Sequence, residues 1–102
     1  MKLLAIEKEI VSPSPEDYAP HLKAEAARVW ELYQAGVIRE MYFRQDRSEA
    51  VLVLECKSTA EANEYLKTLP LVKHKLIRFE VIPLIPYPGL SRLFDQDLSP
   101  TS

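Results

Sequence analysis

The chain has 102 residues, of which 47% are hydrophobic and 27% charged, a composition typical of one globular domain and unlike that of a disordered chain. Thirteen Lys and Arg against fifteen Asp and Glu give a formal net charge of −2, so no long-range positive field is available to attract nucleic acid. A single cysteine cannot form an internal disulfide, and charged residues interrupt the N-terminal apolar run before it reaches the length of a signal-peptide core or a membrane span. We therefore expect a cytoplasmic protein that binds neither nucleic acid nor a membrane.

The first two expected elements are a strand over residues 1–11 and a helix over about 15–35. A Ser-Pro pair followed by acidic residues marks the start of the helix, and Gly36 is well placed to end it in the left-handed conformation. Because Pro20 falls inside the first turns, we expect the helix to kink or restart there. The apolar residues of the helix recur at spacings of three and four and predict one buried stripe. They are Tyr18, Leu22, Ala26, Val29, Trp30 and Tyr33.

Two runs over residues 37–43 and 50–56 flank a polar turn and predict a β-hairpin. A fourth strand is expected over residues 76–85. Pro83 lies within this last run and cannot donate a hydrogen bond to a neighbouring strand, so it indicates a position at the edge or the end of the sheet.

Between the hairpin and the last strand, residues 58–70 predict a second helix. Ser58 and Glu61 have the spacing of a capping box, in which each side chain bonds to the backbone of the other residue. Pro70 is expected to mark the end of this helix.

The resulting order, βαββαβ, predicts an α+β fold of the ferredoxin-like type, a four-stranded antiparallel sheet with two helices on one face. Residues 1–90 are expected to form this single domain, and residues 91–102 a C-terminal tail. Two helices leave the opposite face of the sheet bare, and we call it the uncovered face.

Side chains alternate across a strand, so the purely apolar set of the last strand is expected to face the helices and the other set to lie on the uncovered face. The resulting surface is apolar with several charges, which suits a cavity enclosed against a second subunit. The residues expected on the uncovered face of the first, third and last strands are Glu7, Glu9, Val51, Val53, Glu55, Arg78, Glu80 and Ile82.

The second strand alternates less clearly, so either Arg39 or the pair Glu40 and Tyr42 faces the expected cavity, and the pair is favoured. A carboxylate removed from water can act as a base near neutral pH, and a phenol can hold a developing enolate. These two are therefore the candidate catalytic residues. The alternative is a cross-strand ion pair made by Glu40, with the Tyr42 ring only packed.

Candidate substrate-binding residues are Arg39, Arg78, Glu80 and Glu7. Arg78 can bind an anion, or it can simply neutralise a glutamate of the first strand, which neighbours the last strand in this fold. Only two glycines are present and no cluster of metal-ligating residues is visible, so neither a phosphate-binding loop nor a metal site is expected.

Three segments resemble the muconolactone isomerase-like proteins of the dimeric α+β barrel superfamily. They are "HLKAEAARVWELYQAGVIREMYF", "STAEANEYLKTLPL" and "FEVIPLIPYPG". The resemblance covers roughly residues 1 to 90 and implies a homodimer or larger homo-oligomer, with two sheets facing each other and C-terminal segments reaching a neighbouring subunit. It also implies a cofactor-free isomerase that moves a double bond in an unsaturated lactone by proton transfer. Two alternatives stay open, which are a ligand-binding or structural dimer without catalysis and an enzyme similar to the cofactor-independent monooxygenases of the superfamily.

Overall fold

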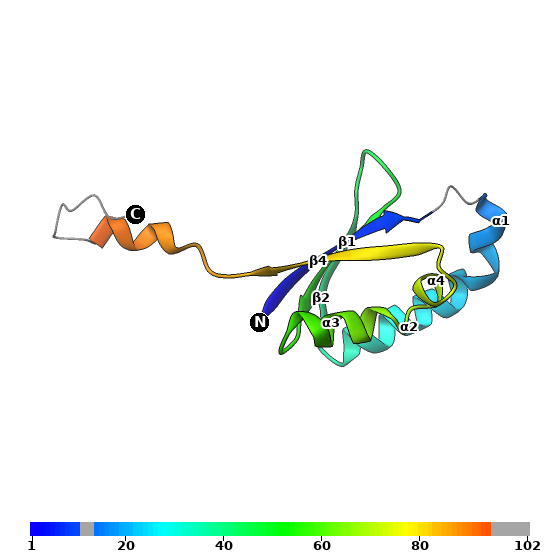
Figure 1. The fold of residues 1–102 in the computed structure, drawn as a ribbon, viewed down its shortest axis with the longest axis horizontal. Coiled ribbons are helices and arrows are strands. Elements are labelled where there is room, and N and C mark those ends of the chain that lie inside the picture. The colour runs from blue at the N-terminus through cyan, green and yellow to red at the C-terminus, as the bar shows by residue number, and fades with distance from the viewer. Residues whose placement is uncertain (11–13, 95–102) are drawn as a thin grey trace.

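The computed structural model describes residues 1–10 and 14–94, and it has four antiparallel strands in the spatial order β2-β3-β1-β4 (Figure 1). The strands are β1 (Lys2–Glu9), β2 (Ile38–Phe43), β3 (Ala50–Glu55) and β4 (Ile77–Leu84). The central pair is therefore β1 and β3, and β2 and β3 form the predicted hairpin. β4 lies at one edge of the sheet, which is the position that its proline indicated.

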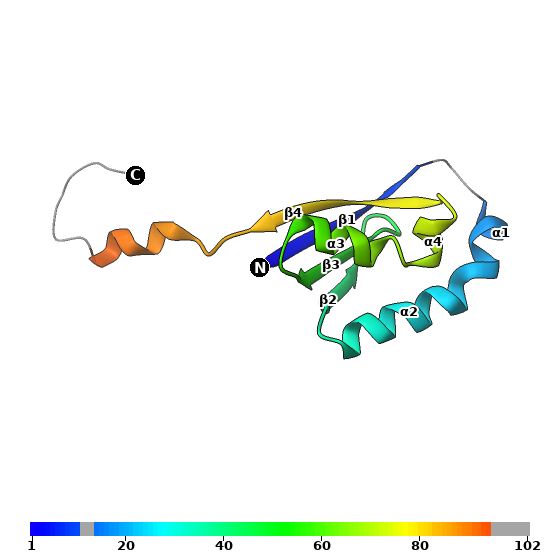
Figure 2. The ribbon, with the colours of Figure 1, turned by 60° about the horizontal axis from the view of Figure 1, so that its bottom comes forward.

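All the helices that pack on the sheet lie on one of its faces (Figures 1 and 2). The first helical segment comprises α1 (Pro15–Tyr18), η1 (Ala19–His21) and α2 (Leu22–Gln34), and the second comprises α3 (Thr59–Leu66) and α4 (Pro70–Lys73). The predicted α+β, ferredoxin-like fold class is confirmed. The expected interruption at Pro20 is also confirmed, because that residue lies in the short 3-10 turn between α1 and α2.

The second helical segment differs from the prediction at Pro70. The N–H of Glu61 donates to the Ser58 hydroxyl at 3.1 Å, as expected for a helix start, but α3 already ends at Leu66. Pro70 is instead the first residue of α4. A proline is tolerated there because the N–H of the first helical residue has no bonding partner within the helix. The Leu-Pro-Leu segment therefore begins a short helix.

The hydrophobic core lies between the sheet and α3. Leu54 is 1% exposed and sits opposite Leu3 of β1 and Ile38 of β2, so it packs at the centre of three strands. The other buried apolar residues of this cluster include Ala5, Leu52, Ala62, Leu66 and Leu69.

We expect Leu54→Ala to lower the free energy of unfolding by about 3 kcal/mol, because the deleted side chain leaves a cavity that its close-packed neighbours cannot fill. Urea denaturation followed by circular dichroism measures this. Lys23→Ala is the control, since Lys23 is exposed on α2 and its loss is expected to cost less than about 0.5 kcal/mol. Equal losses in the two variants would contradict this assignment of the core.

A row of polar contacts joins α2 to the second helical segment. The participating residues of the first helical segment, one at the end of η1 and two on α2, are three or four positions apart, so they lie along one side of it. The contacts are His21 stacked on His74, Glu25 bonded to the N–H of Leu71, and Arg28 bonded to Thr68. They hold α2 beside α3 and α4.

The expected buried stripe of α2 is largely exposed, and this prediction was wrong. Leu22, Trp30 and Tyr33 are all exposed, and Leu32 is the residue of α2 that is fully buried. The row of polar contacts explains the difference, because it attaches α2 to the neighbouring helices while part of the apolar stripe stands away from the sheet. The space left between them is the cavity described below.

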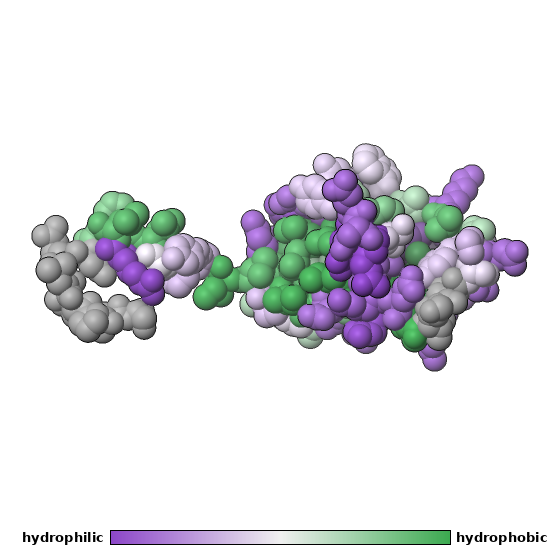
Figure 3. All heavy atoms as spheres, turned by 90° about the horizontal axis from the view of Figure 1, so that it is seen from above, coloured by the Kyte–Doolittle hydropathy of each residue, from purple (hydrophilic) through white to green (hydrophobic). Residues whose placement is uncertain are grey.

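The uncovered face has a partly apolar surface bordered by hydrophilic side chains (Figure 3). Alternate residues of β3 and β4 lie on it as predicted, including Val51, Val53, Arg78 and Glu80. In β1 the prediction was wrong, because Leu3, Ala5 and Glu7 are the set that faces the helices. Both sets of this strand contain apolar residues, namely Leu3 and Ala5 in one and Leu4 and Ile6 in the other, so alternation alone does not decide between them.

The C-terminal segment leaves the body after β4 and contains η2 (Pro88–Phe94) (Figure 1). Leu90, Leu93 and Phe94 are all highly exposed there in the single chain. Residues 95–102 of the expected tail lie outside the described residues.

Candidate functional site

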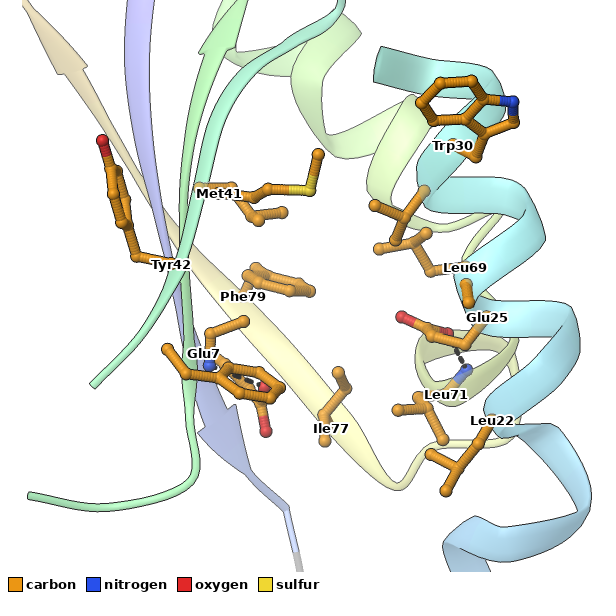
Figure 4. Close-up of a pocket in the computed structure, with 15 residues that line it drawn as sticks. Glu7, Leu22, Glu25, Trp30, Met41, Tyr42, Leu69, Leu71, Ile77 and Phe79 are labelled. Carbon is orange, nitrogen blue, oxygen red and sulfur yellow. Dashed lines mark hydrogen bonds between the residues drawn. The ribbon is translucent and has the colours of Figure 1, made fainter. Parts of the chain in front are cut away.

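A cavity of about 580 Å³ lies between α2 and the sheet (Figure 4). Its volume is within the range of small-molecule sites, and its walls are mostly apolar. Trp30 comes from the helix side, whereas Met41 and Phe79 come from the sheet. Two carboxyl groups interrupt this apolar lining, Glu7 on β1 and Glu25 on α2.

Glu7 lies on the sheet side of the cavity and is only 8% exposed. Its register partner on β4 is Phe79, which also faces the helices. Oε1 of Glu7 accepts a hydrogen bond from the N–H of Ala50 at 2.9 Å. Burial raises the pKa of this carboxyl, the Ala50 bond lowers it, and the nearby carboxylates of Glu49, Glu25 and Glu9 raise it further.

Glu25 points from α2 toward the sheet (Figure 4). Its Oε1 accepts a hydrogen bond of 2.9 Å from the N–H of Leu71, in the first turn of α4, where an unpaired backbone donor is available. Burial raises the pKa of Glu25, and the bond from Leu71 partly opposes that effect. One backbone bond therefore fixes each carboxyl, and among the described residues no donor bonds to the second oxygen of either group.

This pair of carboxyls is suited to moving protons. A carboxyl with a raised pKa keeps its proton closer to neutral pH and can act as an acid. A second carboxyl whose negative charge is less disfavoured by its surroundings ionises and can act as a base. Glu7 has three carboxylates opposing its charge, whereas burial alone raises the pKa of Glu25. Glu7 is therefore better suited to hold a proton and Glu25 to accept one.

We expect Glu7→Gln to stabilise the fold at pH 7 and to have no effect on stability at pH 3.5. Since the pKa of Glu7 in the folded chain lies above its ordinary value of 4.5, the unfolded chain loses this proton first as pH rises. The free energy of unfolding of the unchanged protein therefore falls as pH rises from 4.5 to the raised pKa. Gln has no proton to lose in this range, and its side-chain oxygen still accepts the bond from the N–H of Ala50. Thermal unfolding of both proteins across this range measures the difference. A variant that is less stable at pH 7 would contradict the effect of burial.

Glu40 and Tyr42 lie on the uncovered face, on the other side of the sheet from the cavity. Their register partners are Val53 and Val51, and the Tyr42 hydroxyl donates to Oε1 of Glu40 at 2.7 Å. This bond raises the pKa of Tyr42. The Tyr42 ring points away from the cavity in Figure 4, although the residue borders it. The catalytic role of this pair stays a prediction.

Arg39 lies at a bulge between β2 and β3, and its Nε donates to the carbonyl of Gly36 at 2.6 Å. The bulge explains why the alternation of β2 was ambiguous in the sequence, since it shifts the pairing by one residue.

Arg78 and Glu80 are exposed on the uncovered face of β4. Arg78 sits opposite Lys8, and among the described residues it makes no ion pair with a glutamate of β1. The binding roles of Arg39, Arg78 and Glu80 stay predictions. Glu7 is the one of the four predicted binding residues that lines the cavity.

Glu25 was not identified from the sequence. The signal available was its position beside the apolar stripe, one turn after Leu22 and one turn before Val29, where a carboxyl is unusual. Its bonding partner is 46 residues away, however, and nothing local predicts that contact.

Two further classes of site are absent from the described part of the chain. It contains no group of three or more His, Cys, Asp or Glu residues able to hold a metal ion. It also contains no helix with the length and apolar character needed to cross a membrane.

A family model described as muconolactone delta-isomerase matches residues 7–89. The chain belongs to this family. The match begins at Glu7, near the end of β1, and ends at Gly89 in η2, so all the residues that line the cavity lie within the matched range.

Among solved structures, the isomerase-family chain is similar to the 5-chloro-2-hydroxyhydroquinone dehydrochlorinase TftG from Burkholderia phenoliruptrix, in complex with 2,5-dihydroxybenzoquinone. The TM-score is 0.66 at 16% sequence identity, and the alignment covers 85% of this chain and 97% of the other. At this identity the likeness shows a shared fold. No curated protein sequence matches this chain.

Proposed function

We propose that this protein is an isomerase that moves a double bond in an unsaturated lactone or a related carbonyl compound by proton transfer, within the cavity between α2 and the sheet. The observation that carries this proposal is a pair of carboxyls on opposite walls of an apolar cavity, the buried Glu7 and the half-buried Glu25. Membership of the muconolactone delta-isomerase family supports the reaction class.

In the proposed reaction, the ionised Glu25 takes a proton from the saturated carbon next to the conjugated double bond, which leaves a dienolate delocalised onto the carbonyl oxygen. The protonated Glu7 then delivers its proton to the other end of the conjugated system. The substrate gains one proton and loses one, so no oxidant, reductant or further reactant is needed. Transfer of a proton from Glu25 to Glu7 through water resets the site. The apolar walls support this chemistry because they keep both carboxyls partly desolvated.

The ligand of the structural neighbour supports a ring compound that carries carbonyl groups as the general substrate type. A ligand-binding protein without catalysis is the alternative function, since an apolar cavity of this volume suits binding as well. Turnover separates the two functions.

We also propose that two copies pair through the uncovered face, in the cytoplasm. Leu4, Ile6, Val51, Val53 and Ile82 are only half-buried on this face in the single chain. Pairing two such faces buries them and forms the barrel. The exposed apolar residues of η2 support packing of the C-terminal segment on a neighbouring subunit.

The test of the isomerase function is hydrogen exchange in D₂O, followed by proton NMR. Muconolactone and its methyl ester serve as test compounds. We expect catalysed incorporation of deuterium and appearance of the shifted double bond. Binding of either compound without exchange or isomerisation would support the ligand-binding alternative instead.

A further inference from the structure

The cavity has a marked charge preference. Two carboxyl groups line it, and no Lys, Arg or His does so among residues 1–10 and 14–94. The remaining eleven residues of the sequence contain no Lys, Arg or His either. Positive charge in the described chain is therefore placed elsewhere; Arg28 of α2, for example, is bonded to Thr68 and Glu31 and does not line the cavity.

An anionic ligand is unfavourable in such a site for two reasons. Its carboxylate would lose water of hydration against apolar walls without gaining a cationic partner. It would also face the charge of Glu25, and that of Glu7 whenever this carboxyl ionises. Like charges placed close together at a binding surface repel, so they act specifically against a ligand that carries the wrong charge.

The remaining walls favour unsaturated rings. Trp30, Phe79 and Phe43 present aromatic surfaces and Met41 adds a flexible thioether, all within the same cavity. Aromatic and sulfur groups pack well against flat, polarisable molecules. Both features of the lining therefore select the same kind of ligand.

From this lining we infer that the cavity selects uncharged unsaturated carbonyl compounds and rejects their carboxylate analogues. The inference rests on the proposed function in that the selected compound is taken as the substrate of the isomerisation. It adds a substrate class to that function, namely neutral lactones or esters.

The test compares muconolactone, which carries a carboxylate at neutral pH, with its uncharged methyl ester. Trp30 is the one tryptophan of the chain and lines the cavity, so its fluorescence reports binding in the full-length protein. We expect the ester to bind at least about tenfold more tightly than the acid at pH 7.5. In the double variant Glu7→Gln, Glu25→Gln this ratio is expected to fall several-fold. The double variant Glu16→Gln, Glu64→Gln, which removes two exposed carboxyls outside the cavity, is the charge-matched control and is expected to keep the ratio.

Binding of the acid as tight as that of the ester, or no binding of the ester, would overturn the inference. So would a ratio that the double variant leaves unchanged, because the discrimination would then come from the size of the ester group. The outcome for the isomerase function is separate. An ester that binds selectively but exchanges no hydrogen contradicts catalysis alone, whereas exchange in the acid at the rate of the ester contradicts the substrate class alone.

Discussion

Glu25→Gln is expected to lower the rate of lactone isomerisation by about 10²–10⁴-fold, the usual contribution of a positioned acid or base. Gln keeps an oxygen that accepts the bond from the N–H of Leu71, so α4 and the polar contacts of α2 are retained. What is lost is the ability to take up a proton. The rate of deuterium incorporation into muconolactone methyl ester, followed by NMR, measures the effect.

Glu40→Gln is the discriminating comparison, because Glu40 is the base expected from the sequence and lies on the other face of the sheet. If the reaction takes place in the cavity, this variant keeps most of its activity. The opposite result, with activity lost in Glu40→Gln and kept in Glu25→Gln, would move the reaction to the uncovered face and restore the pair Glu40 and Tyr42 as the catalytic residues.

Val53→Asp is expected to weaken self-association by at least about 100-fold. Val53 is half-buried near the middle of the uncovered face, opposite Leu4 of β1 and Glu40 of β2. Each dimer would contain two new carboxylates that have no cationic partner and are costly to bury. Each new carboxylate would also lie close to the carboxyl of Glu40. Analytical ultracentrifugation over a concentration series measures the change.

The matched control for this variant is Ala60→Asp, which adds the same charge at an exposed position in the first turn of α3. A carboxylate is favourable at a helix N-terminus, so this variant is expected to keep both fold and assembly. Circular dichroism of Val53→Asp checks that its fold is intact. A folded Val53→Asp protein that associates like the unchanged protein would contradict pairing through the uncovered face.

Most of the fold was predictable because its signals are local. Pro20 interrupts the first helical segment through its own missing N–H, and Ser58 starts α3 through a bond to a residue three positions away. Pro83 indicated an edge strand for the same kind of reason. Signals of this type depend only on residues that are close in the sequence, so they can be interpreted without knowing which distant residues are in contact.

The site was less predictable because it depends on contacts between distant residues. The face on which Glu7 lies is fixed by pairing of β1 with β4, since both alternating sets of β1 contain apolar residues. The cavity itself exists because α2 is attached to α4 through Glu25, a contact across 46 residues. Alternation and helical periodicity describe one element at a time, and neither contains this information. For this reason Glu7, which lies on the face of the sheet that the helices cover, was assigned from the sequence to the uncovered face.

The most direct measurement is a crystal structure of the assembled protein with muconolactone methyl ester bound. We predict ligand density between α2 and the sheet, in contact with Trp30 and Phe79 and within hydrogen-bond reach of the free oxygens of Glu7 and Glu25. Density on the uncovered face beside Glu40 and Tyr42, with none between α2 and the sheet, would contradict the location of the site.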